Sequence, residues 1–275
     1  MRVLASIPEA RGALRALRRP LGFVPTMGAL HEGHLALARE ARKRSASVVA
    51  SVFINPTQFG PGEDLVRYPR DYDGDRAKLR DVGVDALFAP EANDVFPPDF
   101  STYVDAGKVG SRYEGAIRPT HFRGVSTVVV KLLHVVAPDA LYLGQKDAQQ
   151  VAVLRKTIRD LNLHVDVVVV PTVREADGLA RSSRNGFLSV EERAAAPSLY
   201  RALQMVMDAL RDGSKKRAAL TKARAALDPL AVEDYLDVVD AATFEPRDSL
   251  GPGAVVIGAV RLGDTRLIDN IPVNR

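Results

Sequence analysis

The chain has 275 residues and a formal net charge of +4, with 46% hydrophobic residues, 26% charged residues and no cysteine. This length fits one large domain or two ordinary ones, and the composition is that of a folded globular protein. The lack of cysteine excludes disulfides, Cys-ligated zinc, iron–sulfur clusters and a thiol nucleophile.

Residues 1–20 contain five arginines interleaved with alanine and leucine, and no signal-peptide core follows them. No apolar run reaches the roughly 18 residues that span a bilayer. We therefore expect a cytoplasmic protein without a membrane partner. The basic charge balance fits nucleic acid, a polyanionic small molecule, or simply an arginine-rich solvated surface.

Apolar segments that alternate with helical patterns dominate the first two thirds of the chain. The expected strands cover residues 21–25, 47–55, 86–90, 140–144 and 165–170. The expected helices cover residues 34–44, 73–82, 124–136 and 147–161. Because strands covered on both faces are almost continuously apolar, this alternation predicts a doubly wound parallel α/β sheet over residues 1–173.

The pattern changes after Val173. A polar loop over residues 178–186 leads to Ser189-Val-Glu-Glu192, a capping box that predicts a helix reaching about Asp212. A basic helix over residues 215–227 and short strands at 235–239, 254–260 and 266–268 complete the pattern. We expect a smaller α+β domain over residues 174–275.

The decapeptide Pro25-Thr-Met-Gly-Ala-Leu-His-Glu-Gly-His34 follows the first expected strand. His31 and His34 share one face at the start of a helix, where backbone N–H groups and a partial positive charge favour phosphates. Two imidazoles there can support charge that develops during transfer at a phosphorus atom. The spacing fits a pair of capping or surface histidines as well. A zinc site requires a third ligand and is the weaker alternative.

Three further segments carry polar groups. Gln58 follows the second strand, and its amide can both donate to and accept from a hydroxy-acid. Lys146, after the fourth strand, suits phosphate, whereas Asp147 and Gln150 also have the spacing of a helix cap. The loop 178–185 has the hydroxyls and guanidinium groups of a phosphate clamp. Each segment alone also fits a turn, cap or linker, but three of the four polar segments lie at one edge of the expected sheet.

Taken together, these motifs resemble those of the pantoate–β-alanine ligase family. The resemblance rests on residues 25–34, Asn55-Pro-Thr-Gln-Phe59, Tyr68-Pro-Arg70, Arg118-Pro-Thr-His-Phe122, Gly144-Gln-Lys-Asp147 and Ser182-Ser-Arg-Asn185, in that order. It extends across essentially the whole chain. It implies a Rossmann-like domain over residues 1–173, a C-terminal lid domain over residues 174–275, a homodimer, and ATP with Mg²⁺. The implied reaction joins pantoate to β-alanine through an acyl-adenylate, with release of AMP and pyrophosphate and without nucleic acid.

The resemblance also implies roles for individual residues. His34 is expected to donate a proton, and His31, Lys146 and Arg184 to stabilise phosphate charge. Gln58 and Gln150 are expected to bind pantoate, Gln58 also to meet β-alanine, and Arg118 and His121 to line the site. The implied ATP ligands are Met27, Gly28, Ala29, Leu30, His31, Glu32, Gly33, His34, Gly144, Gln145, Lys146, Asp147, Val173, Arg181, Ser182, Ser183 and Arg184.

Two positions depart from the family pattern. Arg181 stands where the family usually has Met or Leu. Gly74 interrupts an acidic run that in some relatives lies near Mg²⁺ and leaves Asp73 and Asp75 beside it. We therefore assign no metal ligand, because Mg²⁺ often binds mainly through substrate phosphates.

Two rival functions remain from the sequence. One is a different nucleotidyl transferase on the same scaffold, such as a cytidylyltransferase, which would lack the two glutamines. The other is a nucleic-acid-binding module, suggested by the basic cluster at residues 215–224. That cluster lacks interleaved aromatic residues and also fits a solvated helix face.

Overall fold

The computed structural model describes residues 1–63 and 65–273. The chain forms two compact units, the first comprising Met1–Gly144 and Val153–Val170 and the second Gln145–Ala152 and Pro171–Arg275. The change of unit after Val170 lies close to the expected boundary after residue 173, but the segment that follows Gly144 groups with the C-terminal part of the chain. None of the helices within the described ranges has the length and hydropathy of a membrane span.

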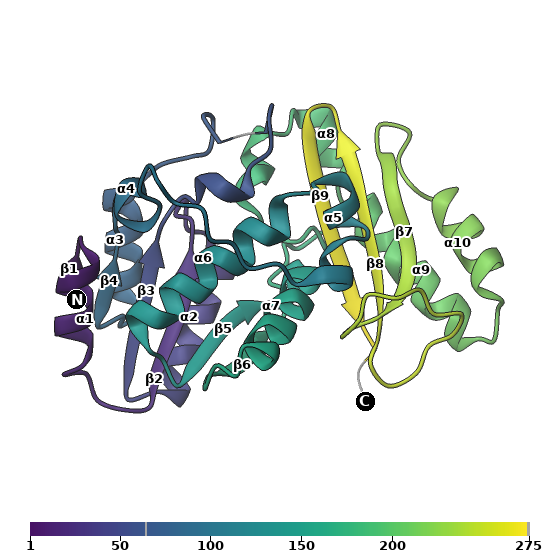
Figure 1. Cartoon of the computed structure of the whole chain (residues 1–275). Coiled ribbons are helices and arrows are strands. Elements are labelled where there is room, and N and C mark those ends of the chain that lie inside the picture. Colours follow the sequence, from purple (N-terminus) through teal and green to yellow (C-terminus); the bar gives the residue numbers. More distant parts are fainter. Residues whose placement is uncertain (64, 274–275) are drawn as a thin grey trace. The chain divides into compact units, whose positions relative to one another are not determined.

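A six-stranded parallel sheet forms the centre of the first unit (Figure 1). Its strand order is β1-β4-β3-β2-β5-β6. The strands are β1 (Arg2–Leu4), β2 (Leu21–Thr26), β3 (Ser47–Val52), β4 (Ala86–Phe88), β5 (Ala140–Gly144) and β6 (Asp166–Val170). The expected parallel sheet is confirmed. The short strand β1 was not predicted, and β3 ends three residues before Asn55.

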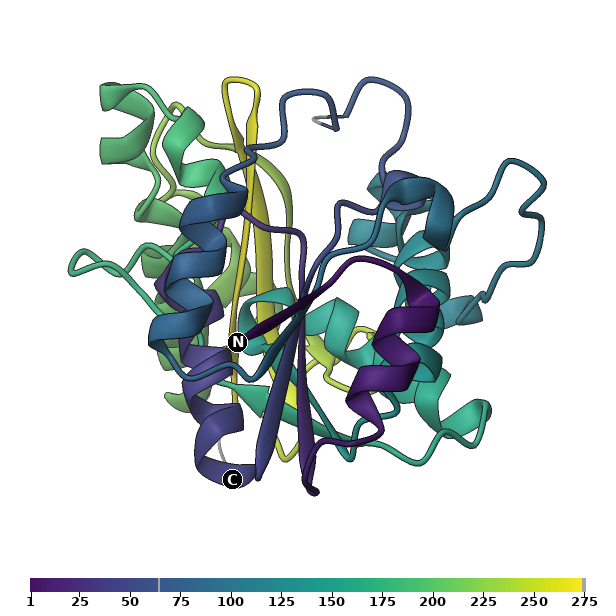
Figure 2. The same cartoon turned by 90° about the vertical axis from the view of Figure 1, so that its left-hand side faces the viewer.

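Helices lie on both sides of this sheet. In Figure 2 the N-terminal helix α1 lies on one side of the strands, and α2 and α3 lie on the other. The helices are α1 (Ile7–Leu14), α2 (Glu32–Arg44), α3 (Tyr72–Asp81), α4 (Ala92–Val95), α5 (Glu114–Ile117), α6 (His121–Val136) and α7 (Ala148–Asp160), with 3₁₀ turns η1 (Pro56–Gln58) and η2 (Gly107–Gly110). Helix α6 begins three residues before the expected start at Gly124. The arrangement confirms the Rossmann-like, doubly wound fold.

Helix α2 is held against the sheet by its buried residues. Leu37, Ala38 and Ala41 are buried and pack in one cluster with Val24 of β2 and Val48 of β3. Burying a large aliphatic side chain contributes about 1.5–3 kcal/mol. The helix is therefore anchored by its interior face, which leaves its N-terminal turn at the carboxyl end of β2.

The order of the strands reverses between β2 and β5. From β2 the chain winds one way to β3 and β4, and from β5 it winds the other way to β6. The pairing of β2 with β5 covers only Gly22↔Ala140 and Phe23↔Leu141, whereas β2 pairs with β3 from Leu21 to Thr26. In open α/β sheets, ligands bind beyond the carboxyl ends of the strands at such a switch point.

The second unit contains an antiparallel sheet of β7 (Val232–Asp240), β8 (Ala254–Leu262) and β9 (Thr265–Pro272). Helix α9 (Ser198–Arg211) packs on β8 and β9, and α10 (Lys216–Arg224) packs on α9 and β7. Their buried residues form one hydrophobic cluster with the inner face of the sheet. The unit also contains the 3₁₀ turns η3 (Gln145–Asp147) and η4 (Ser183–Phe187) and helix α8 (Val190–Ala195).

The capping box of Ser189 and Glu192 is confirmed at the start of α8. The expectation of one helix reaching Asp212 was wrong. Helix α8 ends at Ala195, and α9 begins at Ser198 after Pro197. Proline lacks a backbone N–H and clashes with the preceding turn, so it ends one helix and precedes the next.

Candidate active site

The turn between β2 and α2 is held by a buried carboxylate. Asp75, which is 1% exposed, accepts the backbone N–H of Ala29 at 2.8 Å and that of Leu30 at 2.7 Å. Gly28 has φ +85°, and a Cβ there would lie 3.0 Å from the Asp75 Oδ2 atom. Only glycine therefore adopts this backbone without strain while the carboxylate stays in place.

Lys78, one turn further along α3, adds a second contact to this turn. Its Nζ donates to the Leu30 carbonyl at 3.0 Å and lies 4.0 Å from the Asp75 Oδ1 atom. Burial raises the pKa of Asp75, although the Leu30 and Ala29 N–H groups and Lys78 act to lower it. The β2–α2 turn is thus fixed by three side-chain-to-backbone hydrogen bonds from α3.

His31 and His34 cap the start of α2 reciprocally. The Nδ1 atom of His31 accepts the Gly33 N–H at 3.1 Å, and the Nδ1 atom of His34 accepts the His31 N–H at 3.4 Å. Their ring centroids lie 4.1 Å apart. A neutral imidazole that accepts through Nδ1 carries its proton on Nε2. The capping interpretation is correct, and it gives both rings the tautomer that donates through Nε2.

Gln58 lies in η1, and 8% of it is exposed. Its Oε1 accepts from the Asn55 Nδ2 atom at 3.0 Å, and its Nε2 donates to the Met27 Sδ atom at 2.9 Å. Asn55 also donates to the Gly124 carbonyl at 3.2 Å, and a Cβ at Gly124 would lie 2.4 Å from the Thr57 carbonyl oxygen. The glycine allows α6 to approach η1 closely, which positions the Gln58 amide next to the β2–α2 turn.

Arg118 and His121 hold the backbone of Gln58. The Nδ1 atom of His121 lies 3.0 Å from the Gln58 carbonyl oxygen and donates to it, because a carbonyl only accepts. Arg118 donates to the same carbonyl at 3.3 Å and to His121 Nε2 at 3.3 Å. It also donates to both carboxylate oxygens of Glu63. The guanidinium is thus shared among three protein partners.

The titration of this cluster follows from these contacts. Burial, together with the neighbouring Arg118, lowers the pKa of His121 to about 4, so the ring is neutral at neutral pH. Burial acts to raise the pKa of Glu63, but the Arg118 guanidinium outweighs it and holds the pKa below its ordinary value. A neutral His121 and an ionised Glu63 match the hydrogen-bond directions observed.

In the second unit, two segments that the sequence singled out form the 3₁₀ turns η3 and η4. The Lys146 Nζ atom lies 3.3 Å from the Asp147 Oδ1 atom. Ser182 caps η4 by accepting the Arg184 N–H at 3.3 Å, and the Arg181 N–H donates to the Val173 carbonyl at 2.9 Å. The Arg181 guanidinium donates to Glu175 Oε2 at 2.9 Å.

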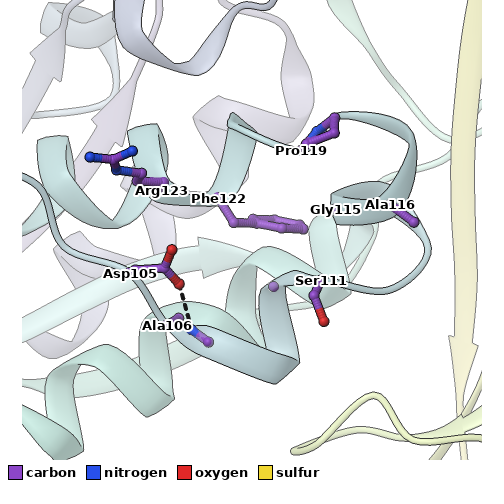
Figure 3. Close-up of a pocket in the computed structure, with 10 residues that line it drawn as sticks. Asp105, Ala106, Ser111, Gly115, Ala116, Pro119, Phe122 and Arg123 are labelled. Atoms are coloured by element: carbon purple, nitrogen blue, oxygen red, sulfur yellow. Dashed lines mark hydrogen bonds between the residues drawn. The ribbon is translucent and has the colours of Figure 1, made fainter.

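A hollow of about 320 Å³ in the first unit is separate from these groups (Figure 3). The Phe122 ring projects toward its centre, and the Asp105 carboxylate accepts the Gly107 N–H at 2.7 Å. Pro119 also lines it. The motif at residues 118–122 therefore has two sides, one against Gln58 through Arg118 and His121, and one against this hollow.

No group of three or more histidine or acidic side chains within residues 1–63 and 65–273 is arranged to hold a metal ion. Asp75, one of the two aspartates beside Gly74, accepts backbone N–H groups with both carboxylate oxygens.

The structure brings together part of the expected site within each unit. Met27 and Gln58 are in contact in the first unit, and Gln145, Lys146 and Asp147 form one turn of the second. Gln58 belongs to the first unit and Gln150 to the second. The sequence did not identify Asp75 as the support of the β2–α2 turn. In the structure Asp75 lies on the same buried face of α3 as Leu79, but an aspartate four residues before a leucine does not by itself indicate this role.

A Rossmann-like sheet with a capped histidine pair at its switch point defines an α/β enzyme of the nucleotide-dependent class. Comparison with known proteins makes this specific. A family model described as pantoate-beta-alanine ligase matches residues 2–272. The chain is 50% identical to the pantothenate synthetase of Roseiflexus castenholzii, with 98% of each chain covered. It therefore belongs to the pantoate–β-alanine ligase family, and its activity is the ligation of pantoate with β-alanine.

Solved structures agree with this assignment. The pantothenate synthetase of Thermus thermophilus superposes with a TM-score of 0.95 at 49% identity, and all of both chains is covered. A pantoate-beta-alanine ligase from Francisella tularensis, complexed with beta-gamma ATP and beta-alanine, gives a TM-score of 0.78 at 31% identity over 99% of this chain and 97% of that one.

Proposed function

We propose that this ligase activates pantoate by adenylation and that β-alanine then displaces AMP. A carboxylate is a poor electrophile for an amine. Attack of the pantoate carboxylate on the α-phosphorus of ATP expels pyrophosphate and gives an acyl group with a good leaving group. The β-alanine amine then attacks the acyl carbon, the bond to AMP breaks, and the amine proton is released.

The histidine pair carries this proposal. His31 and His34 begin α2 at the carboxyl end of β2, and the Nδ1 contacts of both rings direct their protons to Nε2. A helix N-terminus attracts phosphate, and preorganised donors there stabilise charge that develops on the α-phosphate. Met27, Gly28, Ala29, Leu30, Glu32 and Gly33 are the neighbours proposed to bind ATP with them.

Gln58 is proposed to bind pantoate. Its Nε2 donates to a thioether sulfur, which is a weak acceptor, so a pantoate oxygen can replace Met27 there at little cost. Its backbone is fixed by Arg118 and His121, which supports a role for these two residues in orienting the amide. Gln150 is the second proposed pantoate ligand.

The second unit is proposed to bind the phosphates of ATP. Lys146 offers an ammonium, and Ser182, Ser183 and Arg184 offer hydroxyls and a guanidinium from η4. Gln145, Asp147, Val173 and Arg181 complete the proposed nucleotide contacts of this unit, together with Gly144 at the end of β5. The ATP and β-alanine named for the Francisella tularensis relative support this choice of ligands.

Mg²⁺ enters the proposal only as the companion of ATP. The acidic residues of the described ranges form no cluster for it, and Mg²⁺ commonly binds through substrate phosphates and water. The homodimer and the cytoplasmic location remain predictions, and sedimentation of the purified chain measures the first.

An amide-formation assay with pantoate, β-alanine and ATP tests the proposal, provided that AMP and pyrophosphate are quantified separately. We expect one AMP and one pyrophosphate for each amide formed. Formation of ADP and phosphate would instead indicate an acyl-phosphate, and would rule out adenylation.

A further inference from the structure

Asn270, in β9, holds the turn that follows β5. Its side chain is 2% exposed. The Nδ2 atom donates to the carbonyls of Gln145 and Lys146, both at 2.9 Å, and the Oδ1 atom accepts from Gln145 Nε2 at 2.8 Å. Because two backbone carbonyls can only accept, the orientation of the Asn270 amide is fixed.

The neighbouring residue connects the same strand to a second segment. Asp269 is buried, and its carboxylate accepts from the Arg174 Nη1 atom at 2.5 Å and from the Arg174 Nη2 atom at 3.0 Å. The Arg174 guanidinium also donates to the carbonyls of Gly178 and Asn270, and it lies 3.7 Å from the centre of the Tyr200 ring. A charged pair so enclosed is costly to break.

Arg174 begins the short hairpin that leads to the Ser182–Arg184 segment. It forms a bridge with Ala180, directly before Arg181. Strand β9 therefore fixes two segments at once, through Asn270 for residues 145–146 and through Asp269 for the base of the hairpin. Both segments belong to the second unit.

We propose that Asn270 is a positioning residue that sets the backbone of Lys146, so that the Lys146 ammonium and the Ser182–Arg184 segment meet the phosphates of ATP as one preassembled group. This inference rests on the proposed function, which gives Lys146 and Arg184 their phosphate contacts. Both the NH₂ group and the oxygen of the buried Asn270 amide form hydrogen bonds with the turn at residues 145–146. Orientation errors of about 1 Å can cost about a hundredfold in rate.

The test is a double-mutant cycle that combines Asn270→Asp with Lys146→Ala. Asn270→Asp preserves size but directs a carboxylate oxygen at two carbonyls. In the otherwise unchanged enzyme, we expect it to lower kcat for adenylation by about tenfold to a hundredfold. The KM for pantoate should change less than about twofold, because misplaced phosphate ligands act on ATP. In the Lys146→Ala background, Asn270→Asp should lower kcat by less than about threefold. If Asn270 acts by positioning Lys146, its effect is lost once the ammonium is absent, and the two changes are not additive.

Controls separate positioning from damage to the fold. Thr265→Ala removes a buried polar group at the opposite end of β9 and should leave kcat unchanged. Thermal unfolding checks each variant, and Asn270→Ser, which retains one donor, replaces Asn270→Asp if the latter unfolds. An equal fall in kcat from the Asn270 variant in both backgrounds would overturn the inference, as would full activity of a folded Asn270 variant. Either result would leave the proposed function intact. A fully active Lys146→Ala enzyme would overturn the phosphate role of Lys146 and the inference with it.

Discussion

The carboxylate of Asp75 accepts the backbone N–H of Leu30 at 2.7 Å, across 45 positions of sequence. This bond, with that to Ala29, ties α3 to the turn that leads into the histidine pair. The positions of His31 and His34 thus depend on a carboxylate that binds the backbone of the turn before them.

Asp75→Asn should lower both stability and activity, because it disturbs the β2–α2 turn. The substituted amide presents an NH₂ group to one of two backbone N–H groups, and an unsatisfied buried donor costs about 1–3 kcal/mol. We expect a lower melting temperature together with a lower kcat, measured by calorimetry and by the amide-formation assay. Asp73→Asn is the matched control, because Asp73 lies on the same first turn with its side chain 92% exposed. Equal effects of the two changes would contradict the assignment.

His34→Ala should reduce adenylation by at least about a hundredfold, the usual effect of removing one preorganised transition-state donor. It also removes one capping bond of α2, so the free energy of unfolding should fall by only about 0.5–2 kcal/mol. Single-turnover kinetics and urea unfolding measure the two effects. His134→Ala, at an exposed position of α6, should change neither. A folded His34 variant with normal adenylation would remove His34 from the reaction.

Gln58→Ala should weaken pantoate binding far more than ATP binding. Loss of a buried amide that hydrogen-bonds a hydroxy-acid costs about 1–3 kcal/mol. Calorimetric titration of the same variant with each substrate provides its own control. Similar losses for pantoate and ATP would indicate that the change disturbs the Met27 contact and the β2–α2 turn instead.

Acid should destabilise the fold through His121. Its pKa is lowered to about 4 in the folded chain by burial and by Arg118, whereas the unfolded value is near 6.5. The unfolded chain therefore binds more protons between these values. The stability that this residue contributes is fully present above pH 6.5 and is lost as the pH falls toward 4, by an amount on the order of 1–3 kcal/mol.

Urea midpoints at pH 7 and pH 4.5 measure this effect for the unchanged chain and for His121→Gln. Glutamine retains an N–H donor for the Gln58 carbonyl but does not titrate. The variant should lose less stability between the two pH values. An identical pH dependence in both proteins would assign the acid sensitivity to other groups.

Arg181→Met should change the KM for ATP by less than about threefold, well under 1 kcal/mol. The Arg181 guanidinium is paired with Glu175 at 2.9 Å, and its backbone N–H is bonded to Val173. The family's usual apolar residue also indicates that charge is not required here. A tenfold rise in the KM for ATP, with pantoate affinity unchanged, would make Arg181 a phosphate ligand specific to this enzyme.

The sheet was predictable because buried parallel strands are almost continuously apolar, as at residues 47–52. Strand β1 was not, since three residues contain no periodic signal. Pro197 could have indicated a helix break. Because the residues on both sides of it have a helical pattern, the sequence predicts α8 and α9 as one helix.

The candidate site was also predicted only in part. Motif residues such as His34 and Lys146 were identified from the sequence, whereas the residues that hold their backbone in place were not. Asp75 and Asn270 act through side-chain bonds to backbone groups 45 and 125 positions away. Such bonds leave no spacing pattern, because they depend on tertiary packing rather than on local structure.

Exchange of labelled pyrophosphate into ATP tests the central claim most directly. The purified chain is mixed with ATP, Mg²⁺ and labelled pyrophosphate, with and without pantoate, and β-alanine is left out. If the enzyme forms a pantoyl-adenylate, label enters ATP only when pantoate is present, and the His34→Ala variant exchanges far more slowly. Absence of pantoate-dependent exchange in an enzyme that still forms the amide when β-alanine is added would contradict a separate adenylation step.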